Sequence, residues 1–196
     1  MKILIIFGPP GAGKGTQAAM LSKSLGYLHL STGQMFRDAV KSGSELGKKV
    51  KKVIDAGHLV SDKMTSDIID SFFSKNKNLG TARQTCQVPG IILDGYPRNV
   101  NQCYMMDNFS KKYSLELEII NLTADYKELV KRLLKRAEIE KRKDDTEEII
   151  KTRLRIYEKD TAPILDYYKD KIKICNVNGL GTIEEVNKRI MNSISQ

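Results

Sequence analysis

The sequence predicts an α/β fold in which a parallel sheet of five strands is covered by helices on both faces. Five short apolar segments alternate with segments of helical periodicity, as expected for strands buried between two layers of helices. The first apolar segment ends in a glycine-rich loop that opens a helix. A length of 196 residues fits one domain with small inserts, since domains usually contain about 100–200 residues.

The individual elements follow from the local patterns. Strands are expected at residues 3–7, 28–30, 90–93, 115–122 and 172–177. Helices are expected at residues 17–25, 33–41, 44–56, 61–74, 100–111, 125–140, 146–169 and 182–194. Two segments interrupt the alternation, the helices of 31–74 and the charged stretch 131–148, and each is a candidate for a small unit projecting from the sheet. Residues 75–90 are polar and are expected to form a surface loop.

The composition excludes several classes of protein. With 40% hydrophobic and 29% charged residues, the chain is not disordered, collagen-like or a coiled coil. No apolar run approaches the roughly 20 residues of a membrane-spanning helix. The start of the chain lacks the successive charged, apolar and small-residue regions of a signal peptide. We therefore expect a cytoplasmic protein.

The cysteines and the net charge narrow the chemistry only a little. Cys86, Cys103 and Cys175 are far apart and form no Cys-x-x-Cys pair, so we expect neither a disulfide framework nor a zinc site. The net charge of +9 could attract nucleic acid, an acidic membrane or small anions such as nucleotides. Charge alone does not distinguish these partners.

The glycine-rich loop from Gly8 to Thr16 reads GPPGAGKGT and nearly matches the phosphate-binding P-loop pattern. Its glycines free backbone N–H groups to point at phosphate oxygens, its lysine bridges those oxygens, and the following helix directs its positive end at the anion. The predicted strand before it and the predicted helix after it supply the context that this mechanism needs. In one departure from the common pattern, Gly15 follows the lysine directly and the hydroxyl comes at Thr16.

A carboxylate follows the predicted strand at 90–93. Asp94 stands at the carboxyl end of that strand, where open α/β sheets place their ligands. We expect Asp94 and Thr16 to hold Mg²⁺, directly or through water. A simpler role for Asp94, capping the turn into Gly95, stays open.

Three motifs, GPPGAGKGT at 8–16, STGQMFR at 31–37 and DGYPR at 94–98, resemble in this order the signatures of nucleoside monophosphate kinases. Among these enzymes, the adenylate kinase family is the most similar, and the resemblance runs from Lys2 through the last helix. It implies a P-loop nucleoside triphosphate fold, with one kinase domain over 1–196, a helical AMP-binding insert at 31–61 and a short lid at 137–145. The lid has no cysteines and resembles the short-lid form, which has no zinc-binding insert.

The resemblance also implies which residues bind the two nucleotides. Those implied for ATP are Gly11, Ala12, Gly13, Lys14, Gly15, Thr16, Arg132, which would stack on the adenine, Arg136 and Gly181. Those implied for AMP are Thr32, Arg37, His58, Leu59, Val60, Gly95, Tyr96, Pro97, Arg98, Gln102, Arg142 and Arg153. Catalysis is assigned to Lys14, Arg98, Arg136, Arg142 and Arg153. Thr32 and Gln102 would hold the AMP adenine, whereas UMP/CMP kinases typically carry Ala and Asn there.

The implied reaction is the reversible, Mg²⁺-dependent transfer of the γ-phosphoryl group of ATP to AMP, which gives two ADP. It needs no protein nucleophile, because an anionic AMP phosphate oxygen attacks the phosphorus while arginines neutralise and align the phosphates. One residue departs from the family pattern. Gln34 stands where these families usually carry an Asp that orders water around Mg²⁺, which favours weaker metal binding or a lower rate.

Other functions stay open at this point. A kinase of another monophosphate, such as UMP or CMP, or one that uses GTP as donor, would share the same motifs. A basic P-loop protein acting on nucleic acid would explain the charge, but the chain has no Lys/Arg-rich tail and no recognisable aromatic stacking platform. A non-catalytic nucleotide-binding module would not need both phosphate-binding and lid arginines. We expect ATP, AMP and ADP as partners, no nucleic acid or membrane, and a monomer.

Overall fold

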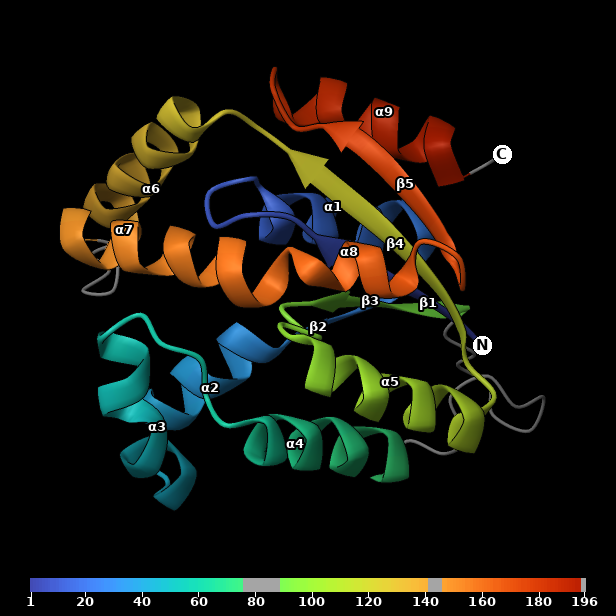
Figure 1. Ribbon diagram of the computed structural model, residues 1–196, viewed down its shortest axis with the longest axis horizontal. Helices are drawn as coiled ribbons and strands as arrows, with labels where there is room; N and C mark the ends of the chain where they lie inside the picture. The colour runs from blue at the N-terminus through green and yellow to red at the C-terminus, as the bar shows by residue number, and fades with distance from the viewer. Residues whose placement is uncertain (76–88, 141–145, 195–196) are drawn as a thin grey trace.

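The computed structural model describes residues 1–75, 89–140 and 146–194. Within them, five strands form one parallel sheet in the order β2-β3-β1-β4-β5 (Figure 1). The strands are β1 (Lys2–Phe7), β2 (Leu28–Ser31), β3 (Gly90–Asp94), β4 (Glu116–Thr123) and β5 (Lys173–Asn178). The α/β class and the five-stranded parallel sheet predicted from the sequence are confirmed.

Helices connect the strands on both faces of the sheet. Helix α1 (Lys14–Leu25) joins β1 to β2, and α5 (Val100–Tyr113) joins β3 to β4. Between β2 and β3 lie α2 (Thr32–Lys41), α3 (Glu45–Asp55) and α4 (Asp62–Lys75). Between β4 and β5 lie α6 (Tyr126–Glu140), α7 (Glu147–Ile156), a π-helical turn η1 (Tyr157–Thr161) and α8 (Pro163–Tyr168). Helix α9 (Ile183–Ile194) follows β5, and no described helix is long and apolar enough to cross a membrane.

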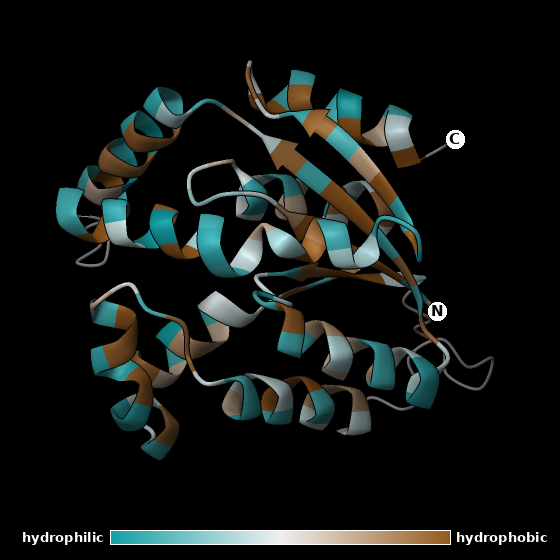
Figure 2. Cartoon of the chain, in the orientation of Figure 1, coloured by the Kyte–Doolittle hydropathy of each residue, from teal (hydrophilic) through white to brown (hydrophobic). Residues whose placement is uncertain are grey.

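Two apolar clusters flank the sheet because side chains alternate between its faces. In β1, Ile3 and Ile5 pack with residues of α4, α5 and α8, whereas Leu4 and Ile6 pack with residues of α1, α6, α7 and α9. Figure 2 shows the hydrophobic strands between helices whose outer faces are hydrophilic. Burying each such side chain contributes about 1.5–3 kcal/mol, so the two clusters hold the carboxyl ends of the strands in place.

Helices α2 and α3 have a small core of their own. Phe36, Val50 and Val60 are buried together, with partly buried apolar neighbours from α2, α3 and α4 around them. Ser44 caps α3 by accepting a hydrogen bond from the backbone N–H of Gly47. Figure 1 shows these two helices standing away from the sheet, on the same side of the molecule as α6 and α7. Their core is separate from the clusters that flank the sheet.

The segment 146–169 differs from its predicted single helix. It consists of α7, the π-helical turn η1 and α8, which starts at Pro163. Proline has no N–H to continue a helical ladder, and π-turns accommodate the extra residue that such an interruption introduces. Helix α1 also starts earlier than predicted, at Lys14 within the glycine-rich loop. Most of the predicted loop at 75–90, and residues 141–145 of the predicted lid, lie outside the described residues.

Candidate active site

A cleft of about 800 Å³ opens where β1, β2 and β3 end, which is where open α/β sheets bind ligands. The glycine-rich loop after β1 forms one wall, and the start of α2 with the turn after β3 forms another. Basic side chains from five elements or turns meet in it. Those from the described residues are Lys14, Arg37, Arg98, Arg132, Lys135, Arg136 and Arg153.

The glycine-rich loop has the conformation of a phosphate cradle. Gly8, Gly11 and Gly13 have φ angles of 136°, 85° and 91°, in the region that favours glycine. A side chain at Gly8 would collide with the carbonyl oxygen of Leu122, so the backbone of β4 packs directly against the loop. Ala12, although predicted to bind ATP, does not present its groups to the cleft. Its methyl group is in the core, and its N–H donates to Pro9 O at 3.1 Å.

Lys14 lies across this loop. Its Nζ donates to the carbonyl oxygens of Gly8 and Pro9 at 2.8 and 2.9 Å. Burial lowers the pKa of Lys14 to about 7; nearby Asp94 opposes this change, and Arg98 adds to it. An anion placed among these cations would restore the charge of the lysine.

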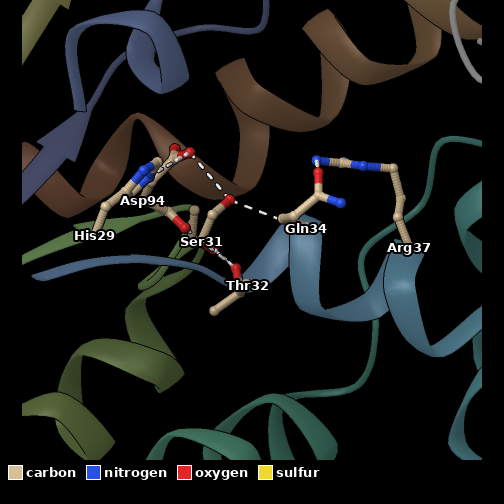
Figure 3. Close-up of polar contacts among 7 residues, drawn as sticks. His29, Ser31, Thr32, Gln34, Arg37 and Asp94 are labelled. Atoms are coloured by element: carbon tan, nitrogen blue, oxygen red, sulfur yellow. Dashed lines mark hydrogen bonds and ion pairs between the residues drawn. The ribbon is translucent and has the colours of Figure 1, made fainter. Parts of the chain in front are cut away.

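Asp94 stands at the end of β3, beside the loop. Its Oδ2 accepts a hydrogen bond from Ser31 Oγ at 3.1 Å and lies 3.7 Å from His29 Nε2 (Figure 3). Burial would raise the pKa of the carboxyl, but the neighbouring His29 and Lys14 outweigh it and hold that pKa below its usual range. Asp94 is therefore an anion in the floor of a cationic cleft.

The oxygen atoms around Asp94 suit a magnesium ion. A Cβ built on Gly15 would lie 3.6 Å from Asp94 Oδ2, and Thr16 lines the same cleft. Mg²⁺ prefers such hard oxygen donors and is commonly held by one or two carboxylates together with substrate phosphates. No group of three or more His, Cys, Asp or Glu side chains able to hold a metal occurs within 1–75, 89–140 and 146–194. One carboxylate and one hydroxyl therefore fit a metal that arrives with a nucleotide, better than a metal caged by the protein alone.

Two arginines from different elements meet over Gly33. A Cβ built there would lie 3.3 Å from Arg37 Nη1 and 3.6 Å from Arg98 Nη2. Beside them is a smaller cavity of about 70 Å³. Its lining includes the predicted AMP residues Thr32, Arg37, His58, Leu59, Val60, Gly95, Arg98, Gln102 and Arg153. Arg37 and Arg98 line both this cavity and the main cleft, and so connect the two.

Arg98 is held in place at three points. Its Nε donates to Gly95 O at 2.8 Å, and its backbone N–H donates to Gln102 Oε1 at 2.8 Å. Its carbonyl oxygen accepts a hydrogen bond of 2.7 Å from the hydroxyl of Thr161. Thr161 lies in η1, so the π-helical turn fixes an arginine that is distant in the sequence.

The third wall of the cleft comes from α6. Arg136 lines it directly, and Arg132 does so while bonding Glu128 Oε1 and Gly179 O at 2.8 and 2.9 Å. Gly181 is not among the lining residues of the cleft; a side chain there would meet Glu185 and Arg189.

The motif DGYPR divides its side chains between the cleft and the core. Pro97 lines the cleft, whereas Tyr96 is 1% exposed and is directed into the core, where its hydroxyl contacts Ser66 Oγ at 3.1 Å. Tyr96 can thus contribute to the site only through its backbone.

Gln34 contacts its own helix rather than the carboxylate of Asp94. Its Oε1 accepts a hydrogen bond from Arg37 Nη2 at 2.9 Å, and its Nε2 donates to Asp38 Oδ1 at 2.7 Å. Figure 3 shows Gln34 directed toward Arg37 and away from Asp94. The residue that departs from the family pattern therefore helps to orient Arg37, an arginine of the cleft.

For several residues of the site the sequence analysis predicts no role. His29 lies in the strand predicted at 28–30, Tyr157 and Thr161 lie in the helix predicted at 146–169, and Ser31 begins the motif at 31–37. The serine alone carried a hint, since it directly precedes a predicted helix and caps it by accepting from Gln34 N–H. Arg142, predicted to bind AMP and to act in catalysis, lies outside the described residues.

The parallel sheet, the glycine-rich loop and the cationic cleft define a P-loop phosphate-binding protein with room for two anionic groups. Comparison with known proteins narrows this class. The family model described as adenylate kinase matches residues 6–173, which is most of the chain. The chain therefore belongs to the adenylate kinase family.

Relatives match along nearly their full lengths. The adenylate kinase of Kocuria rhizophila is 41% identical over 197 aligned residues, covering 100% of both chains. That of Leptospira biflexa is 43% identical and covers 99% of this chain and 100% of its own. That of Chloroherpeton thalassium is 40% identical and covers 97% of this chain and 96% of its own. The resemblance recognised from three short motifs thus extends over the whole chain.

Proposed function

We propose that this chain is an ATP:AMP phosphotransferase, which reversibly transfers the γ-phosphoryl group of ATP to AMP and forms two ADP. The observation that carries the proposal is the meeting of two sets of cations in one cleft. Lys14 and Arg136 lie on the side of the glycine-rich loop, and Arg37 and Arg98 lie on the side of the smaller cavity. Membership of a family that is ATP-dependent and generally uses Mg²⁺ supports the same reaction.

In this proposal, the glycine-rich loop binds the phosphates of ATP. Backbone N–H groups of residues 11–16 and the Lys14 ammonium contact the phosphate oxygens, and the start of α1 directs its positive end at them. Arg132 would lie against the adenine and Arg136 against the phosphates. Thr16 and Asp94 would hold Mg²⁺, partly through water. When bound with ATP, Mg²⁺ supplies neutralisation of phosphate charge.

AMP would occupy the smaller cavity. Arg37 and Arg98 bind its phosphate, and a guanidinium suits this role because it stays charged and grips phosphate oxygens in pairs. Thr32 and Gln102 would contact the base, with the segment 58–60 and Gly95 around it. A volume of about 70 Å³ is far below the roughly 300–1,000 Å³ of ligand sites, so the segment 31–61 would have to open for AMP to enter before it closes over the bound nucleotides.

The protein contributes position and charge rather than a nucleophile or a base. The attacking AMP oxygen is already an anion, and Arg98, Arg136 and Arg153, which line the cleft, would neutralise the phosphates between which the group is transferred. Arg142 would join them from the lid. An arginine that stabilises the transition state of a phosphoryl transfer contributes about 10³–10⁵-fold in rate. The groups invoked here belong to a single chain, which supports action as a monomer; the cytoplasmic location stays a prediction.

The test is Mg²⁺-dependent formation of ADP from ATP with AMP, UMP, CMP or GMP as acceptor. We expect turnover with AMP alone and a loss of at least about 10³-fold in Lys14→Ala. Lys23→Ala is the matched control, since Lys23 is exposed near the end of the same helix. Turnover only with a pyrimidine nucleotide would retain the mechanism and overturn the choice of AMP. No turnover with any acceptor would contradict the proposal.

A further inference from the structure

The side-chain amide of Gln102 is held by two protein groups. Gln102 is 1% exposed and lines the smaller cavity. Its Oε1 accepts a hydrogen bond of 2.8 Å from the backbone N–H of Arg98. Its Nε2 donates one of 2.8 Å to Asp62 Oδ1. The amide therefore has one contact on its oxygen and one on its nitrogen.

These two partners define which way the amide faces. A backbone N–H can only donate and a carboxylate can only accept, so the oxygen must face Arg98 and the nitrogen must face Asp62. Rotating the amide by half a turn would place N–H against N–H and oxygen against carboxylate. Both hydrogen bonds would be replaced by repulsive contacts.

Asp62 is itself well anchored at the first position of α4. The same Oδ1 accepts a second hydrogen bond of 2.7 Å, from Asn99 Nδ2. Asn99 in turn caps α5 by accepting the backbone N–H of Gln102 at 2.9 Å. Asp62, Asn99 and Gln102 thus form a closed ring of hydrogen bonds across the starts of two helices.

After these contacts, the amide retains one N–H and one oxygen lone pair, neither of which has a contact among the described residues. These are the groups that a base in the cavity can use. Because the orientation of the amide is defined, a base in the cavity always meets the acceptor Oε1 on the side of Arg98 and the donor Nε2 on the side of Asp62. A purine with a donor at position 6 beside a ring acceptor, as in adenine, matches that arrangement.

We propose that Asp62 is a positioning residue that fixes the amide of Gln102 for a 6-aminopurine and against a 6-oxopurine. This inference rests on the proposed function, since it places the base of AMP in the smaller cavity. Hypoxanthine carries an oxygen at position 6 beside a ring N–H. A freely rotating amide would turn to bond it, whereas the fixed amide places its own oxygen against the base oxygen.

Three acceptors test the wild-type enzyme, all 5′-monophosphates: AMP, IMP, and the monophosphate of purine riboside, which has only hydrogen at position 6. A fixed amide loses one hydrogen bond with purine riboside monophosphate but meets repulsion with IMP. We therefore expect kcat/KM to fall in the order AMP, purine riboside monophosphate, IMP. IMP turning over better than purine riboside monophosphate would show an amide that rotates, and would overturn the proposal.

Replacing Asp62 tests the residue itself. Asp62→Ala removes one of the two restraints, so we expect kcat/KM for IMP to rise about 5–10-fold relative to purine riboside monophosphate. Asp62→Asn retains a carbonyl oxygen that accepts from Gln102 and should resemble wild type. Asp67→Ala is the matched control, because it removes an exposed carboxylate from the same helix. An unchanged ratio in Asp62→Ala would contradict the proposal.

The ratio of two poor acceptors separates positioning from a general loss of structure. Damage to the cavity lowers kcat/KM for both acceptors and leaves their ratio unchanged. If wild type uses AMP but shows no preference for purine riboside monophosphate over IMP, the role of Asp62 is wrong and the proposed function stands. If wild type does not use AMP at all, both fail.

Discussion

The pKa of Lys14 in the cleft lies far below the ordinary value of a lysine. The side chain is half-buried against its own loop, and burial together with nearby arginines lowers its pKa to about 7. A lysine that bridges phosphates has to be charged when the nucleotide is present. Binding of a polyanion should therefore pull a proton onto this residue.

This proton can be measured at pH 8. At that pH a group with a pKa near 7 is mostly neutral, and adjacent phosphates will raise its pKa above 8. We expect uptake of close to one proton when ATP binds, and weaker binding as the pH rises further. Calorimetry in buffers of different ionisation enthalpy reports the uptake. A binding enthalpy that does not depend on the buffer, or the same uptake in Lys14→Ala, would contradict this prediction.

Gln34 departs from the family pattern and forms its side-chain hydrogen bonds within its own helix. It stands at the start of α2 and forms hydrogen bonds with both Arg37 and Asp38, so a residue of the same helix orients this cleft-lining arginine. With Gln at position 34, the candidate metal site has one carboxylate fewer than the family pattern implies. Asp94, held by Ser31 on the neighbouring strand β2, is the carboxylate that remains at the candidate metal site.

Among the elements, the π-helical turn η1 connects the two halves of the cleft. It follows α7, which carries Arg153, and its last residue, Thr161, donates to the carbonyl oxygen of Arg98. Tyr157, its first residue, lines the cleft beside Phe7, with the ring centroids 5.9 Å apart. Such turns occur preferentially at functional sites, where they redirect side chains that a regular helix would misplace.

The contribution of this turn is tested at Thr161. Thr161→Val retains the shape but leaves the carbonyl oxygen of Arg98 without its donor, a loss of about 1–3 kcal/mol. We expect KM for AMP to rise about 5–10-fold, with KM for ATP changing less than about twofold. Thr161→Ser retains the hydroxyl and should resemble wild type. Steady-state kinetics measure both KM values. Equal changes in KM for AMP and KM for ATP would indicate a general structural defect and contradict the prediction.

At the scale of the whole molecule, the insert 31–61 is in contact with α7. A Cβ built on Gly57, which follows α3, would lie 2.6 Å from Ile149 Cγ2 and 3.0 Å from Arg153 Cγ. The insert can therefore approach this closely only because residue 57 has no side chain. Closure of this kind excludes water from a phosphoryl transfer, and adenylate kinase is a standard example of it.

We expect segments 31–61 and 137–145 to move toward the sheet when both nucleotides bind. Solution scattering should show a smaller radius of gyration with a two-headed ATP–AMP mimic than without it. Gly57→Ala should weaken this change and lower kcat about 10-fold, because the added methyl group meets α7.

Gly43→Ala is the matched control for that variant. Gly43 has a positive φ of 65°, similar to the 75° of Gly57, but a side chain there would meet nothing within 4 Å. Both variants carry a similar cost in backbone strain, so only Gly57→Ala should impair closure. Equal losses of kcat in the two, or an unchanged radius of gyration in wild type, would refute the prediction.

The fold class, the family and many of the residues that line the cleft can be predicted from the amino-acid sequence alone. Buried strands can be recognised from a short apolar segment, because few residue types suit a buried strand. The glycine-rich loop can be recognised because its positive φ angles favour glycine. Lys14, Asp94 and Arg98 were identified from such motifs, and the structure brings them to one cleft. Tyr96 shows the limit, since a motif names a residue without saying where its side chain points.

The groups that position these residues can be identified only in the folded chain. Asp62 and Gln102 lie 40 positions apart in the sequence, and Thr161 and Arg98 lie 63 apart, yet each pair shares one hydrogen bond. Such contacts have no local pattern, because they depend on how α4, α5 and the π-helical turn pack against the sheet. The types of residue that line the cleft can therefore be predicted from local motifs, whereas the orientation of their side chains depends on packing between distant segments.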